Sequence, residues 1–99
     1  MQSETVAVPS PDVVCTELED DQAVLMHVGT QSCYRLNTTG LEIWRAIGRG
    51  LTLIQIGREL EQLFDVTEEL ALNSVVALAQ ELAREDLVSF SPSAEGGGA

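Results

Sequence analysis

The spacing of hydrophobic residues changes near the middle of this 99-residue chain, and this change limits the folds open to it. Residues 13–36 show the alternation of apolar and polar side chains that is typical of strands, whereas residues 38–88 show the three-to-four-residue spacing of amphipathic helices. A chain of this length forms one domain with a single modest core. The sequence therefore predicts an α+β domain in which a small sheet precedes a group of helices.

Three strands are predicted in the first half, at Val13–Leu18, Ala23–Val28 and Gln31–Leu36. A polar turn over residues 19–22 separates the first two, and a tight turn at residues 29–30 separates the second from the third. Connections this short join antiparallel neighbours, so we expect a three-stranded antiparallel meander. The third strand then lies either at an edge or beside another element.

Three helices are predicted in the second half, over residues 39–48, 52–64 and 68 to about 85. Thr39 and Glu42 have the spacing of a capping box at the start of the first helix, and Thr52 and Gln55 have it at the start of the second. We expect the side chain of Trp44, on the first helix, to pack in the core of the domain. A meander followed by three helices is the arrangement of a winged helix-turn-helix.

The two ends of the chain differ in character from the middle. Residues 1–11 contain Pro9 and Pro11 and no periodic pattern, so a flexible N-terminus is expected there. Residues 12–90 form the predicted domain, which closes with a short extended segment at residues 87–90. Residues 91–99 end in a run of glycines and are expected to be a disordered tail.

The charge of the chain restricts its partners. It has 16 Asp and Glu residues against 5 Lys and Arg residues, for a net charge of −11. Phosphate backbones bind proteins chiefly through Lys and Arg, and the predicted third helix offers only Arg84 among several acids. We therefore expect no nucleic-acid partner. No apolar run approaches about 20 residues and no secretory signal is visible, which predicts a cytoplasmic protein without a membrane partner.

Residues that carry chemistry are few. The chain has two cysteines, Cys15 and Cys33, and one histidine, His27, with no spacing that suits a metal site. Nucleophilic catalysis needs a base beside the thiol, but His27 and the cysteines fall on different predicted strands. The sequence therefore predicts no enzyme activity, no metal and no cofactor. We expect free thiols, with a disulfide between the two cysteines as an open alternative.

The predicted third helix has an unusually wide apolar arc. It consists of two adjoining stripes, Val75, Leu78 and Leu82 in one and Leu72, Val76, Ala79 and Ala83 in the other. Together they span roughly 160° of the helix, whereas packing on one core needs roughly 100°. Either the helix is wedged between several neighbours, or one stripe faces a ligand groove. If Gln31–Leu36 is an open sheet edge, the edge and one of these apolar stripes would form a peptide-binding groove, and the sequence leaves open which stripe faces inward.

The run Tyr34–Trp44, YRLNTTGLEIW, resembles the PqqD-like family of RiPP precursor recognition elements. The Thr52 cap followed by Ile56 and Leu60, the Phe64-Asp65-Val66 segment, and the later Leu82 and Leu87 are similar to the same family. The resemblance covers roughly residues 12–90. It implies a non-catalytic winged helix-turn-helix that binds the leader segment of a ribosomally made precursor peptide.

The resemblance also implies where a leader would bind. The leader would add as a strand beside the third strand and pack on the third helix. Carried onto this chain, the expected peptide-binding residues are Gln31, Ser32, Cys33, Tyr34, Arg35 and Leu36 on the strand, and Leu72, Val75, Val76, Ala79 and Ala83 on the helix. The expected partners are the leader peptide, a cysteine-protease-type leader peptidase and an ATP-dependent cyclase, as in free-standing leader-binding proteins of lasso-peptide clusters.

Two alternatives stay open. A PqqD-type peptide chaperone in quinone-cofactor biosynthesis has the same small size, and a generic protein-interaction module would need no peptide maturation at all. Acidic residues at the ends of the third helix, Glu68, Glu69, Glu85 and Asp86, either steer a Lys-rich leader or only keep the surface soluble. Titration with a leader peptide separates these interpretations.

Overall fold

The computed structural model describes residues 5–92, which form two small sheets and three helices. The elements are β1 (Thr5–Pro9), β2 (Val13–Leu18), β3 (Gln22–His27), β4 (Cys33–Leu36), α1 (Thr38–Gly48), α2 (Leu53–Phe64), α3 (Glu68–Arg84) and β5 (Val88–Pro92). The predicted α+β class, with a meander of three antiparallel strands before three helices, is confirmed. The winged helix-turn-helix label for this arrangement stays a prediction.

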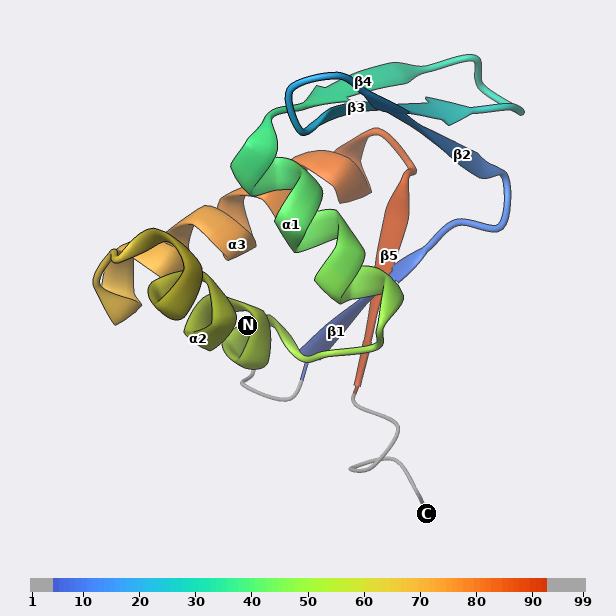
Figure 1. Cartoon of the computed structure of the whole chain (residues 1–99). Helices are drawn as coiled ribbons and strands as arrows, with labels where there is room; N and C mark the ends of the chain where they lie inside the picture. The colour runs from blue at the N-terminus through green and yellow to red at the C-terminus, as the bar shows by residue number, and fades with distance from the viewer. Residues whose placement is uncertain (1–4, 93–99) are drawn as a thin grey trace.

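The three-stranded sheet has the order β2-β3-β4 and lies over α1 and α3 (Figure 1). Ala23 and Leu25 on β3 are fully buried, and their partners across the sheet, Leu36 and Tyr34, share the same face. This face therefore packs on the helices. Because β3 is the only strand beside β4 in this sheet, β4 is an edge, which decides the choice that the sequence left open.

A second sheet joins the two ends of the described chain. β1 and β5 pair antiparallel from Thr5↔Pro92 to Pro9↔Val88 and lie side by side in Figure 1. The expectation of a flexible segment over residues 1–11 is therefore wrong for residues 5–9, where Ala7 is buried in the core. The physical reason is that this strand is stabilised by partners 79 to 87 positions away in the sequence, which no local pattern reveals. β5 also extends the ordered chain to residue 92, and the rest of the predicted tail lies outside the described residues.

Each of the three helices begins directly after a capping residue whose side chain accepts a backbone hydrogen bond. Thr52 accepts from the backbone N–H of Gln55 at 3.2 Å, and the side chain of Gln55 accepts from the Thr52 N–H at 2.8 Å, so the second capping box is confirmed. The capping box predicted for Thr39 and Glu42 is wrong, because Asn37 and not Thr39 caps α1. The Asn37 side chain accepts from the N–H of Gly40 at 2.8 Å. Asparagine caps at least as well as threonine, so the helix begins one residue before the predicted cap.

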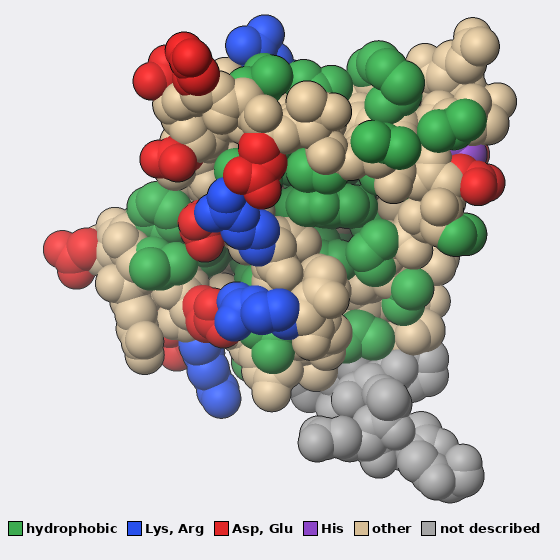
Figure 2. All heavy atoms as spheres, turned by 45° about the vertical axis from the view of Figure 1, so that its right-hand side comes forward, with side chains coloured by type: hydrophobic (Ala, Val, Ile, Leu, Met, Phe, Trp, Pro, Cys, Tyr) green, Lys and Arg blue, Asp and Glu red, His purple; other side chains and the backbone are tan. Residues whose placement is uncertain are grey.

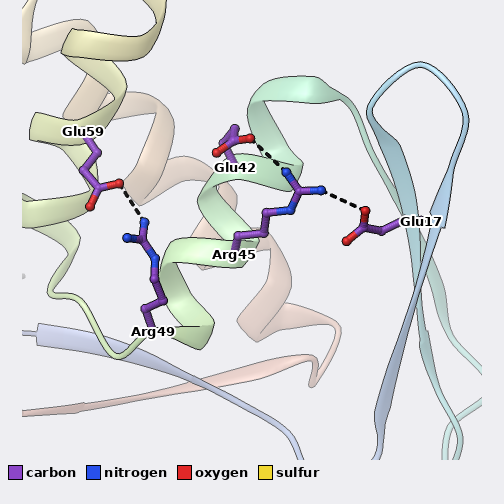
Figure 3. A network of polar contacts seen from close by, with 5 residues as sticks. All are labelled: Glu17, Glu42, Arg45, Arg49 and Glu59. Carbon is purple, nitrogen blue, oxygen red and sulfur yellow. Dashed lines mark hydrogen bonds and ion pairs between the residues drawn. The ribbon is translucent and has the colours of Figure 1, made fainter.

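Exposed ion pairs link α1 and the residue after it to β2 and α2 (Figure 3). Arg45 reaches Glu17 on β2 at 2.8 Å and Glu42 on its own helix at 3.1 Å. Arg49, just after α1, reaches Glu59 on α2 at 2.7 Å. Figure 2 shows blue and red side chains next to one another on one half of this face, and hydrophobic side chains gathered over its centre and other half. The hydrogen bond that Arg45 donates to Glu17 is the main reason that the pKa of Arg45 is raised.

Candidate peptide-binding groove

A cavity of about 700 Å³ lies between β4 and α3. Its size is within the range of about 300–1,000 Å³ that is usual for ligand sites in proteins. One wall is the edge strand and the other is a face of α3, while the beginning of α1 closes one end. Its lining consists of Tyr34, Arg35 and Leu36 on β4, Ser74, Ala77, Leu78 and Glu81 on α3, Asn37, Thr39, Gly40 and Ile43 at the start of α1, and Gln22 on β3.

The strand wall offers backbone groups to an additional strand. The N–H of His27 donates to the carbonyl of Ser32 at 2.8 Å, which makes these two residues a hydrogen-bonded pair of the β3–β4 ladder. Such pairs alternate along antiparallel strands. In the observed register Tyr34 therefore bonds to β3, whereas Cys33 and Arg35 direct their N–H and C=O groups away from the sheet. These outward groups are the hydrogen-bonding template of the edge.

The helix wall is a stripe of two small residues, one leucine and one glutamate on α3. Ser74, Ala77, Leu78 and Glu81 follow at helical spacing, so they share one face of α3. The small side chains at positions 74 and 77 leave room for a chain to lie between the helix and β4. The hydroxyl of Tyr34 donates to Oε2 of Glu81 at 2.9 Å, which places a polar contact between the two walls.

The pKa of the Tyr34 phenol reflects the electrostatics of this contact. Burial raises the pKa of Tyr34 above its usual range, and the hydrogen bond to Glu81 and the charges of Glu81 and Glu85 raise it further. Tyr34 therefore stays neutral and continues to donate to Glu81 at physiological pH. Glu81 and Glu85 make this end of the groove acidic.

Of the six predicted strand residues, three line the cavity. Tyr34, Arg35 and Leu36 do so, although the side chain of Leu36 is 1% exposed and serves mainly as core. Gln31 and Ser32 precede β4 and do not line it. Cys33 pairs with the exposed Met26, so its side chain lies on the outer face of the sheet and only its backbone is directed to the groove edge.

None of the five predicted α3 residues lines the cavity. Val75 and Ala79 are 0% exposed, so the prediction of direct contact by their side chains is wrong. Leu72 faces α2, where its backbone lies 3.4 Å from a Cβ placed on Gly57. Val76 and Ala83 are half-buried against the core. The helix is wedged between α2 and β5 on this side, which explains the wide apolar arc without a ligand.

Sequence reasoning missed the groove face of α3. Leu78 belonged to one of the two apolar stripes but was not among the expected peptide-binding residues, Glu81 was considered only as one of the acidic residues of the helix, and Ser74 and Ala77 were not considered. One signal was available: small residues recur at positions 74 and 77, directly beside the apolar arc. The starting segment of α1 was also missed, because its residues were interpreted only as helix caps.

His27, Cys15 and Cys33 are the candidate chemical residues of this chain. Nδ1 of His27 accepts from the N–H groups of Gly29 and Thr30, both at 3.1 Å, so it is engaged in a turn. Burial, followed by the charge of Glu17, raises the pKa of the Cys15 thiol, and both cysteines are free. Residues 5–92 contain no grouping of three His, Cys, Asp or Glu that would hold a metal. Over the same residues, no helix has the length and apolarity to cross a membrane.

The sequence profile described as Coenzyme PQQ synthesis protein D (PqqD) matches residues 22–88, from β3 to the start of β5. The chain belongs to the PqqD family. The match begins at the strand before the groove edge and includes both groove walls of this PqqD-family protein. No curated protein matches it at a significant level.

Two solved structures share the fold of this PqqD-family protein. One is described as TbiB1 in complex with the TbiA(beta) leader peptide; it is 22% identical, has a TM-score of 0.77, and the match covers 83% of this chain and 94% of that one. The other is described as lasso peptide synthetase B1 complexed with the leader peptide; it is 17% identical, has a TM-score of 0.76, and the match covers 84% and 96% of the two chains. At these identities the likeness establishes the fold.

Proposed function

We propose that this PqqD-family protein is a non-catalytic binder of the leader segment of a ribosomally synthesised precursor peptide. The leader adds as a strand beside β4 and packs against α3. The observation that carries this proposal is the position of the β4 edge. Cys33 and Arg35 direct their backbone groups outward from this edge, and Arg35 lines a cavity whose opposite wall is α3. The two similar solved structures described above are complexes with a leader peptide by their descriptions, which supports the same occupant.

We propose lasso-peptide biosynthesis as the pathway. One of the two similar structures is described as a lasso peptide synthetase B1, which supports this class. In this role the protein acts in the cytoplasm and delivers the precursor to a cysteine-protease-type leader peptidase and an ATP-dependent cyclase. It needs no metal or cofactor of its own. The net charge of −11 suits a basic or neutral peptide.

The binding step is tested by fluorescence anisotropy. The probe is a fluorescein-labelled synthetic peptide that comprises the leader of the precursor encoded beside this protein. We expect saturable binding in the micromolar range or tighter, weakened by salt. A flat titration with protein whose circular dichroism shows a folded state would contradict the proposal.

Delivery is tested separately from binding. The leader peptidase is assayed on the full precursor with and without this protein, and faster cleavage in its presence is expected. If the precursor binds this protein but is cleaved at the same rate with and without it, the proposal of leader recognition stands and the proposal of delivery to the peptidase is contradicted.

The family description favours a second candidate, a peptide chaperone of coenzyme PQQ synthesis. The same fold and groove serve both roles, so the peptide decides between them. An unlabelled PQQ precursor peptide that competes more strongly than the lasso leader in the anisotropy assay would favour this candidate.

A further inference from the structure

Two charged side chains line the groove, one on each wall. Arg35 lies on β4 and Glu81 on α3, and the other lining residues are apolar or neutral. Among residues 5–92, neither Arg35 nor Glu81 forms an ion pair. A guanidinium nitrogen of Arg35 donates to the amide oxygen of Gln22 at 3.3 Å, and Glu81 accepts from the Tyr34 hydroxyl at 2.9 Å. The groove thus presents one positive and one negative charge to a bound chain.

The two charges lie on opposite faces of the edge strand. Successive side chains of a strand point to opposite faces of its sheet. Tyr34 points to the inner face, where it reaches Glu81 on α3. Arg35 therefore points to the outer face, beside its cross-strand neighbour Val24. Because β4 stands between the guanidinium and the carboxylate, the two do not neutralise each other.

A strand added to β4 has the same alternation of faces. All strands of the three-stranded sheet pair antiparallel, and an antiparallel peptide beside β4 continues this pattern. The peptide residue opposite Arg35 then shares the outer face with the guanidinium, with the two Cβ atoms about 5 Å apart. The next residue toward the C-terminus of the peptide lies opposite Tyr34, on the inner face that contains Glu81.

We infer that the groove selects peptides in which an acidic residue is followed directly by a basic one. The inference rests on the proposed function, because the peptide is the one that adds to β4. The acidic side chain pairs with the guanidinium of Arg35 on the outer face, and the basic side chain pairs with the carboxylate of Glu81 on the inner face.

The two charges give the bound strand its register. Backbone hydrogen bonds to Cys33 and Arg35 form with a strand of almost any sequence, so they do not by themselves distinguish one alignment from the next. A slip of one residue moves every side chain of the added strand to the other face. The acidic residue would then face Glu81 or lose its partner, and this alignment is disfavoured by the repulsion of like charges.

Pairs of peptides that differ only in the order of two charges test the register. Two adjacent residues of the labelled leader peptide described above are replaced at each position in turn, once by Asp-Lys and once by Lys-Asp. The two peptides of a pair have the same composition and net charge. At the position that faces Arg35 and Tyr34, we expect Asp-Lys to bind about tenfold more tightly, because both cross-strand pairs become repulsive in Lys-Asp. Outside the strand that lies beside β4, the order should change affinity by less than about twofold.

Matched protein variants assign the two charges. Arg35→Gln and Glu81→Gln each remove one groove charge. Their controls, Arg58→Gln and Glu85→Gln, remove an exposed charge of the same sign that does not line the groove. With the preferred Asp-Lys peptide, we expect each groove variant to lose about threefold to fivefold in affinity and each control to stay within about twofold. The loss should disappear in about 1 M NaCl, where charges are screened beyond about 3 Å, whereas a loss caused by misfolding would remain.

The outcomes separate the charge selection from the proposed function. If the order of the two charges makes no difference at any position, the charge selection is overturned while leader binding stands. It is equally overturned if the control variants lose as much affinity as the groove variants. If the unsubstituted protein binds neither the leader nor any of its charged versions, the proposed function fails first and the charge selection with it.

Discussion

Tyr34 on β4 and Glu81 on α3 are joined by a hydrogen bond of 2.9 Å between two walls of the groove. The residues are 47 positions apart in sequence, so the contact exists only because the sheet is folded over α3. It fixes the separation of the edge strand from the helix at the end of the groove. It also keeps one carboxylate oxygen of Glu81 at the place where a peptide would pass.

The first prediction concerns the ionisation of Tyr34. It is the only tyrosine in the chain, so a titration of phenolate absorbance reports on it alone. Burial raises its pKa most, and Glu81 adds to this through the hydrogen bond and its charge. We expect Glu81→Gln to lower the pKa of Tyr34 toward the usual value without reaching it. An unchanged pKa in Glu81→Gln would show that the hydrogen bond is absent in solution.

The same shift predicts a pH dependence of stability. The folded state holds the phenol proton more tightly than the unfolded state, because the pKa is raised on folding. The contribution of Tyr34 is therefore complete below the unfolded pKa of about 10 and is lost as the pH rises through the higher folded value. Urea unfolding across this alkaline range should show a smaller loss of stability in Tyr34→Phe than in the unsubstituted protein.

The second prediction separates the groove face of α3 from its core face. Ala77 is exposed and lines the groove, whereas Ala79 is 0% exposed. Ala77→Asp should leave the melting temperature nearly unchanged and weaken leader binding at least about tenfold, since it places a charge against the peptide. Ala79→Asp should destabilise the fold by about 3–5 kcal/mol, the cost of an unpaired buried charge. Thermal melts and anisotropy together check both.

The opposite result would also be informative. If Ala79→Asp is well folded and fails to bind while Ala77→Asp binds normally, α3 presents the other stripe to the peptide. That outcome would restore the assignment made from sequence and contradict the groove described above.

The third prediction concerns the backbone of the edge strand. Cys33 directs its N–H away from β3, whereas Tyr34 directs its own toward β3. Cys33→Pro should therefore keep the fold, because proline is tolerated at the first residue of an edge strand, but weaken leader binding about tenfold. Tyr34→Pro should break the ladder and lower stability instead. Cys33→Ser is the matched control, and we expect it to bind normally because the side chain lies on the outer face.

The fourth prediction concerns the turn before β4. His27 is 8% exposed, and its Nδ1 accepts from the N–H groups of Gly29 and Thr30. His27→Phe keeps a ring but removes the acceptor, and should cost about 1–2 kcal/mol of unfolding free energy. Val28→Ala is the control, because Val28 is 60% exposed in the same turn. Equal stability of both variants in urea titrations would contradict a structural role for the histidine.

The sequence by itself determined the local elements of this protein. The alternation over residues 13–36 predicted β2, β3 and β4 to within two residues, and the Thr52–Gln55 capping box predicted the start of α2. These features depend on neighbours in the chain: turn residues, capping side chains and the period of the hydrophobic pattern. The strand that forms one wall of the groove could be located for the same reason, although its position at the edge of the sheet could not.

Only the tertiary structure decided the rest. β1 forms because β5 lies beside it, at the far end of the chain. The side of α3 that faces the groove is set by where α2, β5 and the sheet pack, since all of α3's apolar stripes suit a core equally well before those neighbours are placed. The outward position of the Cys33 backbone depends on the register of the β3–β4 ladder, because a shift of one residue would exchange it with Tyr34. Local patterns specify which residues form a helix or strand, but the packing of distant segments specifies which of their faces remains free to bind.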